Sequence, residues 1–318
     1  MDVVTFGETM VLLAPSRMVP LEYVNGFQKL VAGAETNVAI GLAKMGHDAG
    51  WFSKLGDDPF GRGIRQFVRG HGVDISEVRI TDEAPTGVFF KEQLSPERIQ
   101  VYYYRRHSAA SLMREDELNE DYVAKARFLH VTGITPALSP ECRKLTFRAV
   151  EAAKKHGTAV IFDPNIRWKL WDRDEAGRVL NELAGLADYV LPGIEEGRFL
   201  TGGHTPEEIA ERLLERGAGA VAMKLGGDGA YYSSREGSAY VPGFPVKRLT
   251  DPMGGGDGFA AGFISGLLQG EALPAAVRRG NAVGSIVVGV SGDVEGLPTR
   301  READALLEGG NEAEYTTR

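Results

Sequence analysis

Short apolar runs alternate with longer amphipathic stretches along most of the chain, and this alternation limits the possible fold more than any other feature. The apolar runs are rich in β-branched and aromatic residues and are typical of buried strands: 3–6, 128–131, 160–162, 189–191 and 221–223. Residues 139–156 and 205–217 have helical spacing instead. The repeated order predicts an α/β fold in three layers, a parallel sheet with helices on both faces. Ligands of such folds bind beyond the C-terminal ends of the strands.

Two regions interrupt the alternation. Residues 86–93 and 100–106 resemble the two strands of a β-hairpin, and residues 27–32 resemble a further strand. We expect these segments to form a small antiparallel sheet, a lid, with strands drawn from about 12–32 and 86–106. The lid would belong to a single domain over residues 1–310, followed by a polar tail at 311–318.

The net charge and the cysteine content indicate which partners and which cellular compartment suit the chain. A net charge of −8 without a basic run makes nucleic acid or an anionic membrane surface an unsuitable partner. The single cysteine, Cys142, excludes an internal disulfide and fits a reducing compartment. The N-terminal residues MDVVTFGE lack a signal-peptide pattern, and no apolar run approaches the ~18 residues of a membrane helix. We therefore expect a cytoplasmic protein.

The stretch DPMGGGDGFAAGF, residues 251–263, contains the candidate catalytic group. Apolar residues recur every fourth position from Phe259 until Gly270, which predicts a helix preceded by glycines. Free backbone N–H groups and the helix dipole favour an anion at such a start. Asp257 stands at this place, either as a helix cap or as a group that accepts a proton from an attacking hydroxyl. The second interpretation requires the glycines to hold a phosphoryl group during transfer.

Two other nucleotide motifs fit this stretch less well. A phosphate-binding loop of the Walker type is excluded, because the chain has no Gly-Lys pair. The spacing Gly256-x-Gly258-x-x-Ala261 matches a loose dinucleotide fingerprint, so an NAD-dependent oxidoreductase is an alternative class. The acidic residue expected about twenty positions further on is missing, which argues against that class.

Five segments in order resemble the signatures of PfkB carbohydrate kinases, the ribokinase-like family. They are 32–37 (AGAETN), 54–61 (KLGDDPFG), 193–196 (GIEE), 224–229 (KLGGDG) and 251–257 (DPMGGGD). The resemblance implies a Rossmann-like domain with a β-sheet lid, ATP and Mg²⁺ as cofactors, and a homo-oligomer formed through the lid. Segments 101–105, 130–138, 163–167 and 292–296 resemble the branch of the family that phosphorylates 2-keto-3-deoxygluconate, a sugar acid.

The resemblance also implies roles for individual residues. Asp257 would be the general base, and Gly254, Gly255 and Gly256 would form the anion hole. The substrate would contact Gly33, Asn37, Tyr103, Arg105, Arg167 and Asp293. The nucleotide would contact Gly193, Lys224, Gly226, Gly229 and Asn281, and Glu196 would act on Mg²⁺ indirectly.

Several of these residues have a simpler interpretation. Asn37 could equally well cap a helix, and Asp293 could simply belong to a turn. Glu196 could be a surface residue at the start of a helix. Gly193 stands where the family has Asn or Ser, and Phe89 lacks a hydroxyl that could meet the substrate.

Arg105 and Arg167 are the residues that indicate a sugar acid as the substrate, because a sugar acid presents a carboxylate that guanidinium groups bind well. Strand alternation places Tyr103 and Arg105 on one face and Tyr102 and Tyr104 on the other. The alternative within the family is a fructokinase or another sugar or sugar-acid kinase, and fructose would be favoured if both arginines were dispensable. A sugar-binding protein without catalysis is a further alternative.

Overall fold

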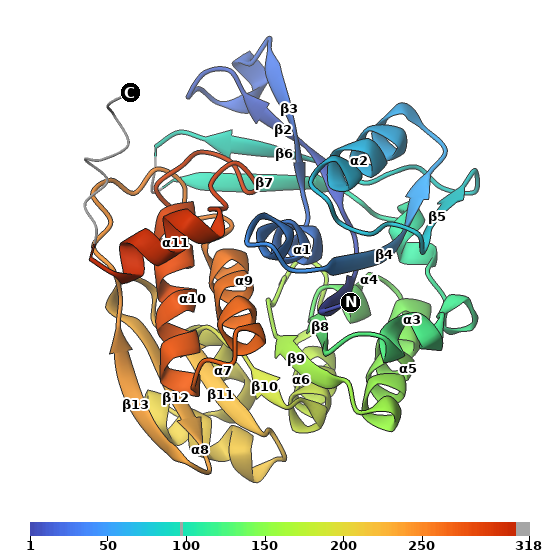
Figure 1. Cartoon of the computed structure of the whole chain (residues 1–318). Helices are drawn as coiled ribbons and strands as arrows, with labels where there is room; N and C mark the ends of the chain where they lie inside the picture. Colours follow the sequence, from blue (N-terminus) through green and yellow to red (C-terminus); the bar gives the residue numbers. More distant parts are fainter. Residues whose placement is uncertain (96–97, 310–318) are drawn as a thin grey trace.

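The main body is built on a nine-stranded sheet with the strand order β13-β12-β11-β10-β9-β8-β1-β4-β5 (Figure 1). This is a computed structural model, and it describes residues 1–95 and 98–309. The strands are β13 (Gly237–Pro242), β12 (Gly229–Ser234), β11 (Ala220–Lys224), β10 (Tyr189–Val190), β9 (Ala159–Asp163), β8 (Phe128–Thr132), β1 (Val3–Phe6), β4 (Ala49–Gly56) and β5 (Val78–Thr81). All neighbours from β11 to β5 are parallel, whereas β12 and β13 add an antiparallel edge. The predicted α/β architecture is confirmed.

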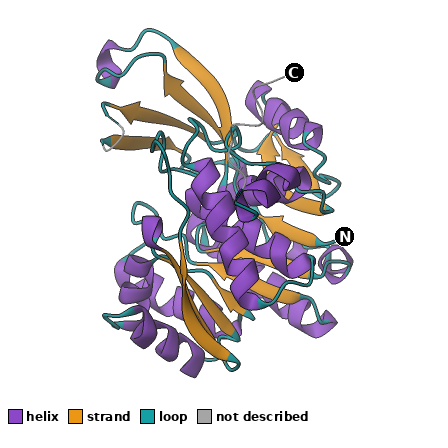
Figure 2. Ribbon diagram, turned by 60° about the vertical axis from the view of Figure 1, so that its left-hand side comes forward, coloured by secondary structure: helices purple, strands orange, loops and turns teal. Residues whose placement is uncertain are grey.

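Helices cover both faces of this sheet (Figure 2). One layer consists of α1 (Ala34–Lys44), α2 (Pro59–Gly70), α9 (Gly255–Leu268), α10 (Leu273–Val287) and α11 (Arg300–Leu307). The opposite layer consists of α3 (Glu120–Ala124), α5 (Pro140–His156), α6 (Arg173–Leu186), α7 (Ile194–Thr201) and α8 (Pro206–Glu215), with the short α4 (Thr135–Leu138) before α5. Buried apolar side chains form one cluster on each face, so the sheet is the middle of three layers.

The predicted long helices begin where their sequence signals place them. Ser139 caps α5 by accepting from the backbone N–H of Cys142, and Thr205 caps α8 by accepting from that of Glu208. Proline occupies the first turn of both helices, where its missing N–H costs nothing. The polar tail predicted at 311–318 lies outside the described residues.

A second sheet of four strands forms the lid, in the order β3-β2-β6-β7. Its strands are β2 (Met10–Pro15), β3 (Phe27–Ala32), β6 (Val88–Gln93) and β7 (Ile99–Tyr104). The expectation of an antiparallel lid is wrong at its centre, because β2 and β6 pair in parallel. β2 and β6 both leave the main body, and their antiparallel partners β3 and β7 return to it, so the two outgoing strands lie side by side (Figure 1).

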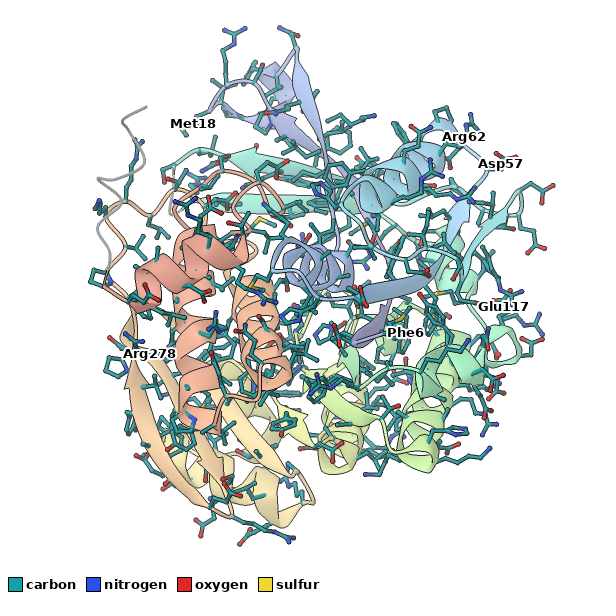
Figure 3. All side chains as sticks on the ribbon, in the orientation of Figure 1. Phe6, Met18, Asp57, Arg62, Glu117 and Arg278 are labelled. Atoms are coloured by element: carbon teal, nitrogen blue, oxygen red, sulfur yellow. The ribbon has the colours of Figure 1, made fainter. Side chains whose placement is uncertain are left out.

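Burial differs sharply between the centre of the body and the tip of the lid (Figure 3). Phe6 at the end of β1 is fully buried and stacks on Phe52 with ring centroids 4.6 Å apart. Met18, in the loop between β2 and β3, is 62% exposed. Within the described part of the chain, no helix is long and apolar enough to span a bilayer.

Helices α1 and α9 approach each other closely, and this contact sets the position of the candidate site. A Cβ atom at Gly41 of α1 would lie 2.9 Å from the Cβ of Ala261 on α9, so the interface requires a glycine. The first turns of the two helices also meet, since the Asn37 side chain of α1 donates a hydrogen bond to Asp257 of α9.

Candidate active site

The start of α9 is an open anion-binding cradle made of Gly254, Gly255 and Gly256. Gly254 has φ of 78°, a left-handed conformation, and forms the helix N-cap without a side-chain hydrogen bond. A Cβ at Gly256 would face the Lys224 Nζ atom at 3.6 Å, so a bare backbone leaves room above the helix end. Because the first N–H groups of a helix have no partner within it, this glycine cradle can bind an anion.

Asp257 lies in the first turn of α9 and is 8% exposed. It is not the helix cap, because Gly254 occupies that position, so the capping interpretation is wrong. The Asn37 side-chain amide donates to its Oδ2 atom at 2.8 Å, and that of Asn165 donates to its Oδ1 atom at 3.4 Å. The carboxylate is therefore held in a fixed orientation beside the cradle.

Asn37 connects two acidic side chains. Its amide nitrogen donates to Asp257 and, at 3.3 Å, to the Oδ2 atom of Asp293. Gly33 caps α1, so the capping interpretation of Asn37 is also wrong. Among the described residues, the buried Oδ1 atom of Asn37 has no hydrogen-bond partner. That oxygen can accept a hydrogen bond from a bound hydroxyl.

Burial raises the pKa of Asp257 to about 7. The Asn37 hydrogen bond and the Arg167 charge lower this pKa, whereas the neighbouring Asp293 and Asp163 carboxylates raise it. Burial likewise raises the pKa of Asp293 above its ordinary value. A carboxylate with a pKa near neutrality is well matched to accept a proton at physiological pH.

A cavity of about 320 Å³ lies between this carboxylate and the lid. Its walls hold every residue predicted to contact the substrate, namely Gly33, Asn37, Tyr103, Arg105, Arg167 and Asp293. Gly254, Gly256, Glu196 and Lys224 line it as well. The predicted strand alternation is confirmed, since Tyr103 and Arg105 face the cavity and Tyr104 on the other face is 70% exposed.

The two arginines of this cavity differ in their partners. Arg105 is buried and donates from its Nε atom to the Glu8 Oε2 atom at 2.6 Å, forming an ion pair. Arg167 is exposed, and no side-chain hydrogen bond or ion pair joins it to another described residue. Arg105 is thus held in place by an acid, while the Arg167 guanidinium is available to a ligand.

Lys224, at the end of β11, lies between two acids. Its Nζ atom donates to the Asp163 Oδ2 atom at 2.7 Å. Burial alone would lower the pKa of Lys224, but the Asp163 and Glu196 carboxylates raise it above its ordinary value. Glu196 accepts from the backbone N–H groups of Gly193 and Ile166 at 2.8 and 2.7 Å, so it lies at a helix start. The expected surface position is wrong, because Glu196 is half-buried in the wall of the first cavity.

A second cavity, of about 480 Å³, opens on the other side of the cradle. Its lining is largely apolar and includes Phe244, Val246, Leu249, Phe259 and Val288. The predicted nucleotide residues Gly226, Gly229 and Asn281 also line it, and the Asn281 amide donates to the Val241 carbonyl at 3.0 Å. Within the described part of the chain, Gly193 is absent from the walls of both cavities.

The two cavities meet at Lys224, Pro252 and Gly256, which line both of them. Gly255 faces the second cavity and Gly254 the first, so the cradle spans their boundary. A group that passes from one cavity to the other would cross the helix N-terminus beside Asp257.

The sequence interpretation missed three residues of the site: Glu8, Asp163 and Asn165. Each follows or ends a parallel strand, β1 for Glu8 and β9 for the other two. Polar residues at the C-terminal ends of predicted strands were therefore the signal that could have found them. Asn165 also has φ of 37°, which the sequence does not reveal.

Comparison with known proteins gives the family of this chain. The model of the pfkB family carbohydrate kinases matches residues 1–300, and the chain belongs to this family. It is similar to a 2-dehydro-3-deoxygluconokinase of Bacillus subtilis, with 45% identity over 96% of this chain and 95% of that protein. It is also similar to a 5-dehydro-2-deoxygluconokinase of Shouchella clausii, with 35% identity over 96% and 95%.

Solved structures agree with this assignment. A PfkB protein from Polaromonas sp. JS666 superposes with a TM-score of 0.89 at 44% identity, covering 96% of this chain and 99% of that one. An Escherichia coli protein named as a candidate ribokinase II, in complex with ATP and Mg²⁺, gives 0.90 at 26% identity over 96% and 99%. The chain is thus an ATP-binding carbohydrate kinase. The NAD-dependent alternative is wrong, and residues 243–254 before α9 also lack the strand that its fingerprint requires.

The hydrogen bond from Asn37 gives a prediction about pH. Since it lowers the pKa of Asp257, Asn37→Ala should raise that pKa and move the acid limb of kcat/KM from near pH 7 to higher pH. The measurement is the pH dependence of sugar phosphorylation by both proteins. A rate that falls equally at every pH, with an unchanged midpoint, would contradict this role.

Proposed function

We propose that this enzyme transfers the γ-phosphoryl group of ATP to the terminal hydroxyl of 2-keto-3-deoxygluconate (2-dehydro-3-deoxygluconate), giving the 6-phosphate. The observation that carries the proposal is the position of Asp257, at the edge of the first cavity and one residue after the glycine cradle that joins both cavities. Its high identity to a 2-dehydro-3-deoxygluconokinase supports this acceptor.

The proposed reaction assigns a role to each of these groups. The sugar hydroxyl loses its proton to the Asp257 carboxylate as its oxygen forms a bond to the γ-phosphorus. The bond from that phosphorus to the bridging oxygen breaks, and ADP leaves. The N–H groups of the glycine cradle and the Lys224 ammonium stabilise the negative charge on the transferring group.

The second cavity is suited to the rest of the nucleotide. Its apolar walls can cover a base, while Gly226 and Gly229 keep the turn after β11 close to the phosphates. Gly229 has φ of 102°, and a Cβ there would strike the Val241 carbonyl at 2.2 Å, so this tight turn needs a glycine.

Mg²⁺ fits this site as an ion carried largely by the nucleotide phosphates. The described residues contain no cluster of three or more acidic, His or Cys side chains that could hold a metal by themselves. Glu196 lines the first cavity next to Lys224, where its carboxylate would act on such an ion indirectly by ordering the water around it. When bound, Mg²⁺ would neutralise charge on the β- and γ-phosphates.

The arginines favour a sugar acid over a neutral sugar. Asp257 and Asp293 make the inner end of the cavity acidic, which repels a substrate carboxylate from the reacting centre. Arg167 offers an unpaired guanidinium for that carboxylate, and Arg105 offers the N–H groups that Glu8 leaves free. A substrate bound this way has its carboxylate toward the arginines and its terminal hydroxyl toward Asp257.

The test is an ADP-release assay across acceptors, with Arg167→Ala as the diagnostic variant. The acceptors are 2-keto-3-deoxygluconate, its galactonate epimer, 5-dehydro-2-deoxygluconate, fructose, ribose and adenosine. We expect 2-keto-3-deoxygluconate to give the highest kcat/KM. Loss of a charged hydrogen bond should raise KM for this acid about ten- to a hundredfold in Arg167→Ala while KM for ATP stays constant.

The matched control is Arg106→Ala, since Arg106 is exposed and absent from the walls of both cavities in the described structure. For Arg105 the suitable variant is Arg105→Lys, which keeps a charge opposite the buried Glu8. Equal changes of KM for sugar acid and ATP would contradict carboxylate recognition. Higher activity on fructose would replace the proposal by a fructokinase.

We also propose that the lid mediates a homo-oligomer. Its outer face carries a row of aromatic rings, with Phe27 and Phe90 at a centroid distance of 5.4 Å, and Phe90 and Tyr104 at 5.6 Å. Phe27 and Tyr102 are each 39% exposed, and Tyr104 is 70% exposed. A contiguous apolar patch of this kind is typical of an interaction surface.

If the outer face of the lid forms the oligomer, the mass of the protein in solution should change when this face is altered. The wild type should sediment as a multiple of its 34.4 kDa chain, and Tyr104→Glu should shift it toward the monomer by placing a charge in the interface. Analytical ultracentrifugation measures both. A monomeric wild type would contradict the proposal.

A further inference from the structure

One buried ion pair outside the predicted site joins the lid to the glycine cradle. The Lys91 Nζ atom, on lid strand β6, donates to the Asp251 Oδ2 atom in the loop before α9. Lys91 is 4% exposed and Asp251 is 1% exposed. Burying two charges is costly, and a pair of this kind is maintained only with good geometry and further hydrogen bonds.

Asp251 supplies those further hydrogen bonds from two other segments. Its Oδ1 atom accepts from the backbone N–H of Met253 at 3.2 Å, within the loop that leads to Gly254. Its Oδ2 atom accepts from the backbone N–H of Gly292 at 3.5 Å, next to Asp293. One carboxylate thus contacts the cradle loop, the turn that carries Asp293, and the lid.

Lys91 is also placed to align the lid with the acceptor. Phe89 precedes Lys91 by two residues on β6, so the two side chains lie on the same face of the strand. Phe89 lines the first cavity. Met253 packs against the apolar inner face of the lid formed by Met10, Leu12, Ala32 and Phe89. The cradle loop is therefore attached to the lid by one polar and one apolar contact.

We propose that Lys91 is a positioning residue for phosphoryl transfer. Through Asp251 it fixes the glycine cradle and Asp293 relative to lid strand β6, so that the acceptor and the transferring group stay aligned. Small displacements of reacting groups slow a reaction strongly, even when the substituted residue does not touch them. The proposal rests on the kinase reaction proposed above, but not on which sugar is the acceptor.

The experiment compares kcat and both KM values for Lys91→Met, for the doubly substituted Lys91→Met/Asp251→Asn protein and for Lys91→Arg. Lys91→Met leaves the Asp251 charge buried and alone, so its kcat should fall about ten- to a hundredfold. The double substitution removes both charges and should recover thermal stability while kcat stays low. Lys91→Arg keeps the cation and should retain most of kcat.

The matched control is Lys29→Met, which removes an exposed lysine from lid strand β3 and should leave kcat unchanged. A folded doubly substituted protein with wild-type kcat would show a purely structural pair and overturn the proposal. If neither Met variant folds, Lys91→Arg decides, and a folded Lys91→Arg protein below a tenth of wild-type kcat would overturn it.

The choice of acceptor separates this proposal from the proposed function. All variants are assayed with the acceptor on which the wild type is most active, whether or not that is 2-keto-3-deoxygluconate. A wild type that prefers another sugar refutes the substrate, and the Lys91 variants still test the positioning role on that sugar.

Discussion

The structure depends on a carboxylate held where an anion would otherwise bind. Asp257 lies at the start of α9, beside three glycines whose N–H groups attract negative charge, and its own burial raises its pKa to about 7. Protonated, it does not repel a phosphate. Ionised, it can accept the proton of a hydroxyl in the same cavity. The close packing of α1 on α9 at Gly41 makes this arrangement possible, because it brings Asn37 within hydrogen-bond distance of the carboxylate.

The other charges around the site are arranged in pairs. Glu8 holds Arg105 and Asp163 holds Lys224 at the edge of the sheet, while Asp251 holds Lys91 of the lid next to the glycine cradle. Such pairs contribute little net stability, because burial of both charges offsets their attraction. Their value here is orientation. Arg167 is exposed and lacks a side-chain partner among the described residues, so the cavity retains one guanidinium that is available to an anionic ligand.

Local patterns predicted much of the fold and the start of helix α9. Strand alternation placed Tyr103 and Arg105 on the inner face of the lid, and the glycines before Phe259 marked the start of α9. Contacts between distant segments could not be read in this way. The parallel pairing of β2 with β6 depends on how both strands leave the body, and the partners of Asn37 are more than 200 residues away in the sequence. Its spacing fitted a helix cap equally well, and only the packing of two helices decides its role.

The most direct test of the account is the kinetics of Asp257→Asn. The amide keeps the shape of the side chain but cannot accept the proton, so turnover should fall by ~10²–10⁴. Binding of ATP and of the sugar substrate, measured separately by calorimetry, should stay within a few fold of the wild type. A variant that keeps full turnover, or one that loses activity only because it no longer binds its substrates, would contradict the role of Asp257 as the general base.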